Sequence, residues 1–401
     1  MSRRTKIIIA IVIVLLLIAL GVFLYFLFTK QPLTPDDGGT FPPLTDEIVP
    51  PEELPTVLPE GRPGAFEPIL RQLSKVPVAG AVLGLKSGVP IARYQERAAG
   101  NVYEIGADGE GEKRLTNTTI PRVYEAIWSK SGAALIARYT REGNSEVIES
   151  FSAKVNPGTS GKDGELQGSF LPRGISDAAI SPDGTAVFYL QEENGGAMGI
   201  RSDLSGNGKT KLWASPVKEW LVAWPSQNRI TLLSKPSALS DGMFLSLDPV
   251  SGGGGNLLLR GVMGLTALMS PARQDILYSA SNESGLSLLL FDATTARERT
   301  IDTTTLPEKC AWAKNGERFY CGVPKTIPDG SYPDAWYQGV IHFEDEVWSI
   351  SMGGSAERVL DVSTKRGIPI DLVNPQISAD EKFLIFTDKE SGTLWSLQMT
   401  E

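Results

Sequence analysis

Short apolar runs separated by polar turns recur along most of the chain, in the pattern of β-hairpins. In the clearest copy, residues 178–190, two apolar runs flank the polar turn at residues 181–185. Six further copies exist, and the residues before the seven turns lie 43 to 65 positions apart: Leu85, Trp128, Ile180, Trp224, Met269, Trp312 and Ile377. A hairpin repeated about every forty residues is typical of the blades of a β-propeller.

Further apolar runs follow each hairpin and complete four strands per repeat. In the fourth repeat, for example, they are residues 244–247 and 256–259. The sequence therefore predicts an all-β fold, a seven-bladed β-propeller. A strand-like segment at residues 70–73 precedes the first repeat, whereas the last repeat ends after its third strand. We expect the N-terminal segment to supply the outer strand of the last blade and so to close the ring.

An uninterrupted apolar run occupies residues 7–28, and 22 residues of helix are long enough to cross a bilayer. Arg3, Arg4 and Lys6 precede it, which places the N-terminus in the cytoplasm and the propeller outside, in the periplasm or at the cell surface. The alternative is a cleaved signal peptide, which has a shorter apolar region and a small-residue cleavage site. We predict a single-pass membrane protein with a cytoplasmic tip and transmembrane helix at residues 1–30.

The segment at residues 31–68 contains ten prolines and nine charged residues, mostly acidic. Such a segment buries too little apolar surface to fold, so we predict a disordered linker that tethers a propeller at residues 69–401. The net charge of −9 and the lack of clustered Lys and Arg argue against nucleic acid as a partner.

The longest loop, residues 322–342, is the first candidate for a binding site. It contains Tyr332, Asp334, Trp336, Tyr337 and His342. Long ordered loops are often functional, and Tyr and Trp are frequent anchors of protein interfaces. The alternative is that these aromatic side chains pack the loop onto the propeller.

His342 is the only histidine in the chain. A lone histidine without neighbouring cysteines does not match a zinc site, and no Gly-x-Ser-x-Gly motif accompanies it. We therefore expect no metal, no cofactor and no enzymatic activity.

Cys310 and Cys321 are the only cysteines, and they flank the turn at Asn315 and Gly316. A two-residue turn would place the two cysteines opposite each other, and an extracytoplasmic site would permit a disulfide. Two buried free thiols are the alternative.

The turn sequence Ile180-Ser181-Pro182-Asp183-Gly184 resembles the repeat of WD40-like propellers of the TolB type, and residues 270–271 and 378–380 look like degenerate copies. The resemblance covers about residues 70–401 and implies a binding disc. We therefore expect a membrane-tethered scaffold or adaptor for an envelope protein or peptide. The alternative function is an enzyme, or a sensor of small molecules or metals, that uses the central channel.

Overall fold

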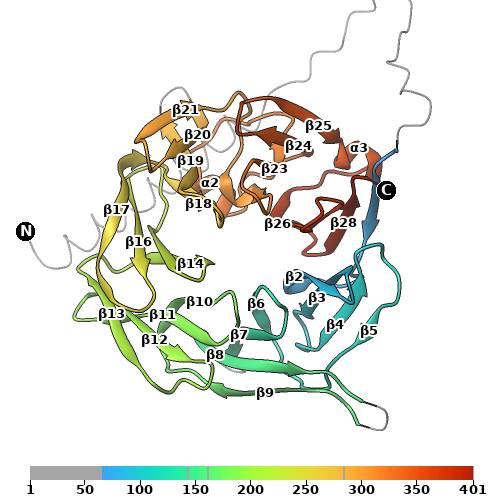
Figure 1. The fold of residues 1–401 in the computed structure, drawn as a ribbon, viewed down its shortest axis with the longest axis vertical. Coiled ribbons are helices and arrows are strands. Elements are labelled where there is room, and N and C mark those ends of the chain that lie inside the picture. The colour runs from blue at the N-terminus through green and yellow to red at the C-terminus, as the bar shows by residue number, and fades with distance from the viewer. Residues whose placement is uncertain (1–65, 142–143, 160–161, 283–284, 401) are drawn as a thin grey trace, which may run out of the picture. The chain divides into compact units, whose positions relative to one another are not determined.

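The computed structural model describes residues 66–400 except 142–143, 160–161 and 283–284. The described residues form seven four-stranded antiparallel sheets, arranged as blades of one ring (Figure 1). The predicted seven-bladed propeller is therefore confirmed.

Each blade runs from an inner strand to an outer strand (Figure 1). Blade 1 contains β2 (Val78–Lys86), β3 (Val89–Glu96), β4 (Val102–Gly106) and β5 (Lys113–Arg114). Blade 2 contains β6 (Val123–Trp128), β7 (Ala134–Arg141), β8 (Asn144–Asn156) and β9 (Glu165–Phe170). Blade 3 contains β10 (Ile175–Ile180), β11 (Ala186–Glu193), β12 (Gly196–Asp203) and β13 (Thr210–Ser215). Blade 4 contains β14 (Trp220–Ser226), β15 (Arg229–Ser234), β16 (Asp241–Asp248) and β17 (Gly252–Met263).

The remaining three blades have the same order of strands. Blade 5 contains β18 (Thr266–Met269), β19 (Asp275–Asn282), β20 (Gly285–Asp292) and β21 (Arg297–Thr300). Blade 6 contains β22 (Cys310–Trp312), β23 (Arg318–Pro324), β24 (Asp345–Ser351) and β25 (Ala356–Leu360). Blade 7 contains β26 (Leu372–Ile377), β27 (Phe383–Asp388), β28 (Leu394–Gln398) and, at its outer edge, β1 (Ile69–Gln72). Three short helices complete the described elements: η1 (Pro307–Lys309), α2 (Asp334–Tyr337) and α3 (Val362–Arg366).

The repeated turn sequence has a structural role in the hairpins. The Ser181 hydroxyl donates to Asp183 Oδ1 at 2.6 Å, and Gly184 has a φ of +74° that favours glycine. In the degenerate copy, the Ser378 hydroxyl likewise donates to Asp380 Oδ1 at 2.6 Å. The motif therefore shapes the turn between the first two strands of a blade.

The ring closes through the N-terminal strand, as predicted. β1 pairs antiparallel with β28, from Ile69 opposite Gln398 to Gln72 opposite Trp395 (Figure 1). The backbone N–H of Leu394 also donates to the Ser74 hydroxyl at 2.8 Å. Because β1 covers the outer edge of β28, the first and last parts of the propeller hold each other in place.

The hydrophobic core lies between the blades. Seven clusters of buried side chains each join two neighbouring blades, and an eighth lies under the insertion between β23 and β24. Trp128 and Trp312 belong to these junctions, and their indole N–H groups donate to Gly80 O and Leu268 O in the preceding blade. Packing between blades therefore positions every loop on the two faces of the ring.

The predicted membrane span at residues 7–28 and the linker up to residue 65 lie outside the described residues. Within the described part of the chain, no helix is both long and apolar enough to cross a membrane. The structure thus gives no support to the anchor or the linker, and both remain predictions.

Candidate functional site

The insertion between β23 and β24 covers residues 325–344 and contains α2. The predicted loop therefore starts too early, because Gly322 still belongs to β23. Tyr332 and Trp336 are both 3% exposed and pack with Leu306 and Phe343 in one apolar cluster. These two aromatic side chains hold the insertion on the propeller and offer almost no surface to a partner.

A buried group of charges lies beneath the insertion. Lys309, which ends η1, is fully buried, and its Nζ lies 2.7 Å from Asp345 Oδ2 and 2.5 Å from Asp371 Oδ1. The Trp336 indole N–H donates to Asp371 Oδ2 at 2.9 Å. We call Lys309, Asp345 and Asp371 the buried triad; it joins blade 6, blade 7 and the insertion.

Burial sets the electrostatics of the triad. It raises the pKa of Asp345 to about 6, although Lys309 opposes the shift. Asp345 Oδ2 accepts the backbone N–H of Leu372 at 2.6 Å, whereas Oδ1 accepts no hydrogen bond from the described residues. Each carboxylate is thus held near the Lys309 ammonium in surroundings from which water is excluded.

Polar contacts fasten the rim of the insertion. Asp334 Oδ2 accepts the backbone N–H of Ala238, in the loop between β15 and β16, at 2.5 Å. The Tyr337 hydroxyl donates to Glu308, and Lys389 Nζ donates to Trp336 O at 2.8 Å. α2 is therefore fixed from blades 4, 6 and 7.

The outer surface of this fixed insertion and of the adjoining loop between β15 and β16 is partly apolar. Leu239 is 85% exposed and Val340 is 73% exposed, and Tyr337 is also exposed. Leu239 follows Ala238, which bonds Asp334, and the Val340 N–H bonds Ala335 O within the insertion. We call Leu239, Tyr337 and Val340 the insertion surface.

The structure separates the residues predicted for this site into two groups. Tyr332 and Trp336 lie in the buried cluster, whereas Asp334 and Tyr337 lie at the rim. His342 is exposed and directly precedes the buried Phe343.

The two cysteines lie in blade 6, and Cys310 directly follows Lys309 of the buried triad. Cys310 of β22 is the register partner of Cys321 of β23, and the two form a disulfide. This bond joins the first two strands of the blade that carries the insertion.

Sequence reasoning missed the triad and Leu239. Lys309 and Asp371 are 62 positions apart and meet only because blades 6 and 7 are neighbours. The available signal was a lysine directly before the apolar strand that begins at Cys310.

Charged groups also lie on the first two strands of blade 2 and on the inner strand of blade 3. Arg138 is buried, and it donates to Glu125 Oε2 at 2.7 Å and to Ser176 O at 2.8 Å. Asp177 accepts the backbone N–H of Val222 at 2.7 Å, and burial raises its pKa to about 6. These groups connect blades 2, 3 and 4. In the described residues no three His, Cys, Asp or Glu side chains gather in a way that could hold a metal ion.

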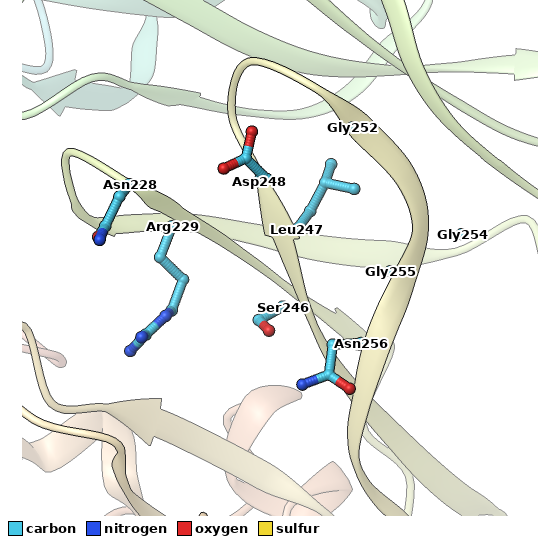
Figure 2. A pocket seen from close by; sticks show the side chains of 9 residues that line it. All are labelled: Asn228, Arg229, Ser246, Leu247, Asp248, Gly252, Gly254, Gly255 and Asn256. Carbon is cyan, nitrogen blue, oxygen red and sulfur yellow. The ribbon is translucent and has the colours of Figure 1, made fainter.

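A polar pocket of about 510 Å³ lies on blade 4, at the turns between β14 and β15 and between β16 and β17 (Figure 2). Its lining includes the side chains of Asn228, Arg229, Ser246, Asp248 and Asn256. These turns belong to the face of the ring opposite the insertion, since the insertion joins a second strand to a third.

No protein-family model and no curated protein matches the chain. Among solved structures, an oligogalacturonate lyase in complex with manganese aligns with a TM-score of 0.51 at 12% identity, over 84% of this chain and 98% of that chain. A hydrazine synthase from Kuenenia stuttgartiensis aligns with a TM-score of 0.50 at 12% identity, over 82% of this chain and 98% of that chain. TolB from Acinetobacter baumannii aligns with a TM-score of 0.42 at 12% identity, over 78% of this chain and 67% of that chain.

The lyase and the hydrazine synthase are similar to this chain in fold alone. One prediction was wrong: we expected no enzymatic activity, because the lone histidine is not accompanied by a Gly-x-Ser-x-Gly motif. Oligogalacturonate lyases are enzymes that align over nearly their whole length with this propeller. The fold alone therefore does not exclude catalysis.

Proposed function

We propose that this chain is a membrane-tethered, extracytoplasmic β-propeller that binds a protein or peptide partner through the insertion surface. The observation that carries the proposal is the contrast within the insertion itself. Its inner side is fixed by buried aromatic residues and by the triad, whereas its outer side exposes apolar residues to solvent.

A rigid base favours binding because little conformational entropy is lost when a partner docks. Leu239 and Val340 come from different blades, yet Asp334 and Ala238 connect the segments that carry them. Exposed apolar groups on a fixed surface, with a tyrosine among them, are typical of protein interfaces.

The tether comes from the sequence. The apolar run at residues 7–28, with Arg3, Arg4 and Lys6 before it, supports a cytoplasmic N-terminus and a propeller outside the membrane. The acidic, proline-rich segment at residues 31–68 would then hold the propeller away from the bilayer surface.

The test is capture of a partner from envelope extract by the full-length chain in detergent. Val340→Asp and Leu239→Asp place a charge on the insertion surface, whereas Val250→Asp does the same at a 79% exposed residue on the opposite face. We expect the wild type and Val250→Asp to retain the same partner and both insertion variants to lose it. Capture of an identical set of proteins by all four chains would refute the proposal.

The tether has a separate test. Protease added to spheroplasts should degrade the propeller and leave a small membrane-bound fragment. Release of the intact propeller from washed membranes by high salt alone would contradict a transmembrane anchor.

A further inference from the structure

The pocket on blade 4 contains two opposite charges that do not pair with each other. Ile230 and Leu247 are register partners, so Arg229 and Asp248 occupy the next opposing positions on β15 and β16. Opposite charges in such positions usually attract each other across the strands. Here the Arg229 guanidinium and the Asp248 carboxylate point apart (Figure 2), and neither has an ion pair among the described residues.

Each charge is held in place by other contacts. Asp248 Oδ1 accepts the backbone N–H groups of Val250 and Ser251 at 2.9 and 2.7 Å, which leaves Oδ2 free for a further donor. These hydrogen bonds, with that of Ser251 the strongest, lower the pKa of Asp248, so the carboxylate is ionised at neutral pH.

Arg229 is held from blade 5. Its Nη1 donates to Arg273 O at 3.3 Å and lies 3.7 Å from Met269 Sδ. These contacts use only one of the guanidinium nitrogens, and an arginine has five N–H donors. Nε and Nη2 form no hydrogen bond with the described residues, and Arg229 lines the pocket together with Asn228 and Asn256.

This arrangement restricts the chemistry of a ligand. A phosphate dianion would be attracted by the Arg229 guanidinium but repelled by the Asp248 carboxylate in the same pocket. A planar base or ring would find no aromatic side chain in the lining. A molecule with a carboxylate at one end and an ammonium at the other satisfies both charges.

We infer that the pocket on blade 4 binds a small zwitterion of the amino-acid type, with its carboxylate on Arg229 and its ammonium on Asp248. The amides of Asn228 and Asn256 would supply further hydrogen bonds to the carboxylate. The site lies on the face opposite the insertion surface, so the inference does not depend on the proposed function.

The test is calorimetric titration of the full-length chain with the twenty common amino acids and with β-alanine and γ-aminobutyrate, which separate the two charges further. Sodium acetate supplies only the carboxylate and methylammonium chloride only the ammonium, so each serves as a half-ligand. Inorganic phosphate tests whether the pocket binds a simple anion. We expect at least one zwitterion to bind, and each half-ligand to bind at least about tenfold more weakly.

Three variants locate the site. Arg229→Gln and Asp248→Asn should each weaken binding by at least about tenfold, and Asn retains an oxygen that can accept the turn hydrogen bonds. Asp292→Asn is the matched control, because Asp292 accepts the N–H groups of Thr294 and Thr295 in the corresponding turn of blade 5, outside the pocket. It should leave the affinity unchanged.

Asn256→Asp adds a carboxylate at an exposed residue of the lining and should also weaken binding without disturbing the fold. The inference is overturned if no zwitterion binds the wild type, if acetate or phosphate binds as tightly as the best zwitterion, or if folded Asp248→Asn and Asn256→Asp bind like the wild type.

Discussion

The buried triad and the pocket on blade 4 both bring opposite charges together, but they use them differently. In the triad, Lys309 Nζ lies within 2.7 Å of an oxygen of each of two carboxylates, and all three side chains are buried. In the pocket, the Arg229 and Asp248 side chains point apart from neighbouring strands (Figure 2), and both line the cavity of about 510 Å³. In the triad each carboxylate has the Lys309 ammonium as its partner, whereas the two charges of the pocket form no ion pair among the described residues.

This difference separates structural charges from candidate binding charges. Removing one partner of a buried pair leaves an uncompensated charge and is strongly destabilising. Removing an exposed charge that has no partner costs the fold little. Substitutions at the two places should therefore affect different measurements, stability for the triad and ligand binding for the pocket.

Lys309→Met should have the largest effect on stability. It removes the ammonium that pairs with both Asp345 and Asp371, and we expect the free energy of unfolding to fall by about 3–5 kcal/mol in urea denaturation. Lys314→Met, at an exposed lysine of the same blade, is the control and should change little. A Lys309 variant as stable as the control would remove the distinction between the two regions.

Trp336→Phe should have an intermediate effect. The ring can still fill the apolar cluster, but the hydrogen bonds to both oxygens of Asp371 are lost. We expect a loss of about 1–3 kcal/mol in the free energy of unfolding. Tyr337→Phe removes only the hydroxyl that donates to Glu308 at the exposed rim, and it should cost less. The reverse order would mean that the rim, and not the triad, fixes the insertion.

Asp345 should make stability depend on pH in an identifiable direction. Its pKa is about 6 in the folded protein, above its ordinary value of 3.8, so the folded state binds more protons between these values. Protonation of Asp345 as the pH falls through about 6 therefore increases the free energy of unfolding, and this increase is lost as the pH rises again. Relative to Asp345→Asn, the wild type should gain about 1–2 kcal/mol between pH 7.5 and pH 5. Parallel pH curves for the two proteins in urea denaturation would contradict the role assigned to this carboxyl.

The pocket variants should have the smallest effects on the fold. Arg229→Gln and Asp248→Asn should each leave the melting temperature within about 2 °C of the wild type, because neither breaks an ion pair. Differential scanning calorimetry without ligand measures this directly. A large drop for Asp248→Asn but not for Asp292→Asn would show that Asp248 has a structural role that its turn hydrogen bonds do not explain.

The repeated hairpins made the fold predictable, since each blade contains its own strand pattern and turn. The closure by residues 70–73 was also predictable, because a surplus strand at one end matched a missing strand at the other. The insertion was harder to interpret: Tyr332 and Tyr337 have the same side chain, yet one packs inward and the other lies at the surface.

Contacts between blades set the limit of the prediction. Lys309 contacts Asp371 across the junction of blades 6 and 7, and no sequence pattern within one blade predicts that contact. Arg229 begins β15 and Asp248 ends β16, so their opposition follows from the register of these two strands. The register did not predict whether the Arg229 and Asp248 side chains would form an ion pair or point apart.

The most direct test of the central claim is photo-crosslinking from single residues of the full-length chain in intact envelopes. A photoreactive amino acid is placed at Val340 on the insertion surface or at Val250 on the opposite face, both of which are exposed. The proposed function predicts a discrete protein adduct from Val340 and none from Val250. Equal adducts from both positions, or an adduct from Val250 alone, would contradict binding through the insertion surface.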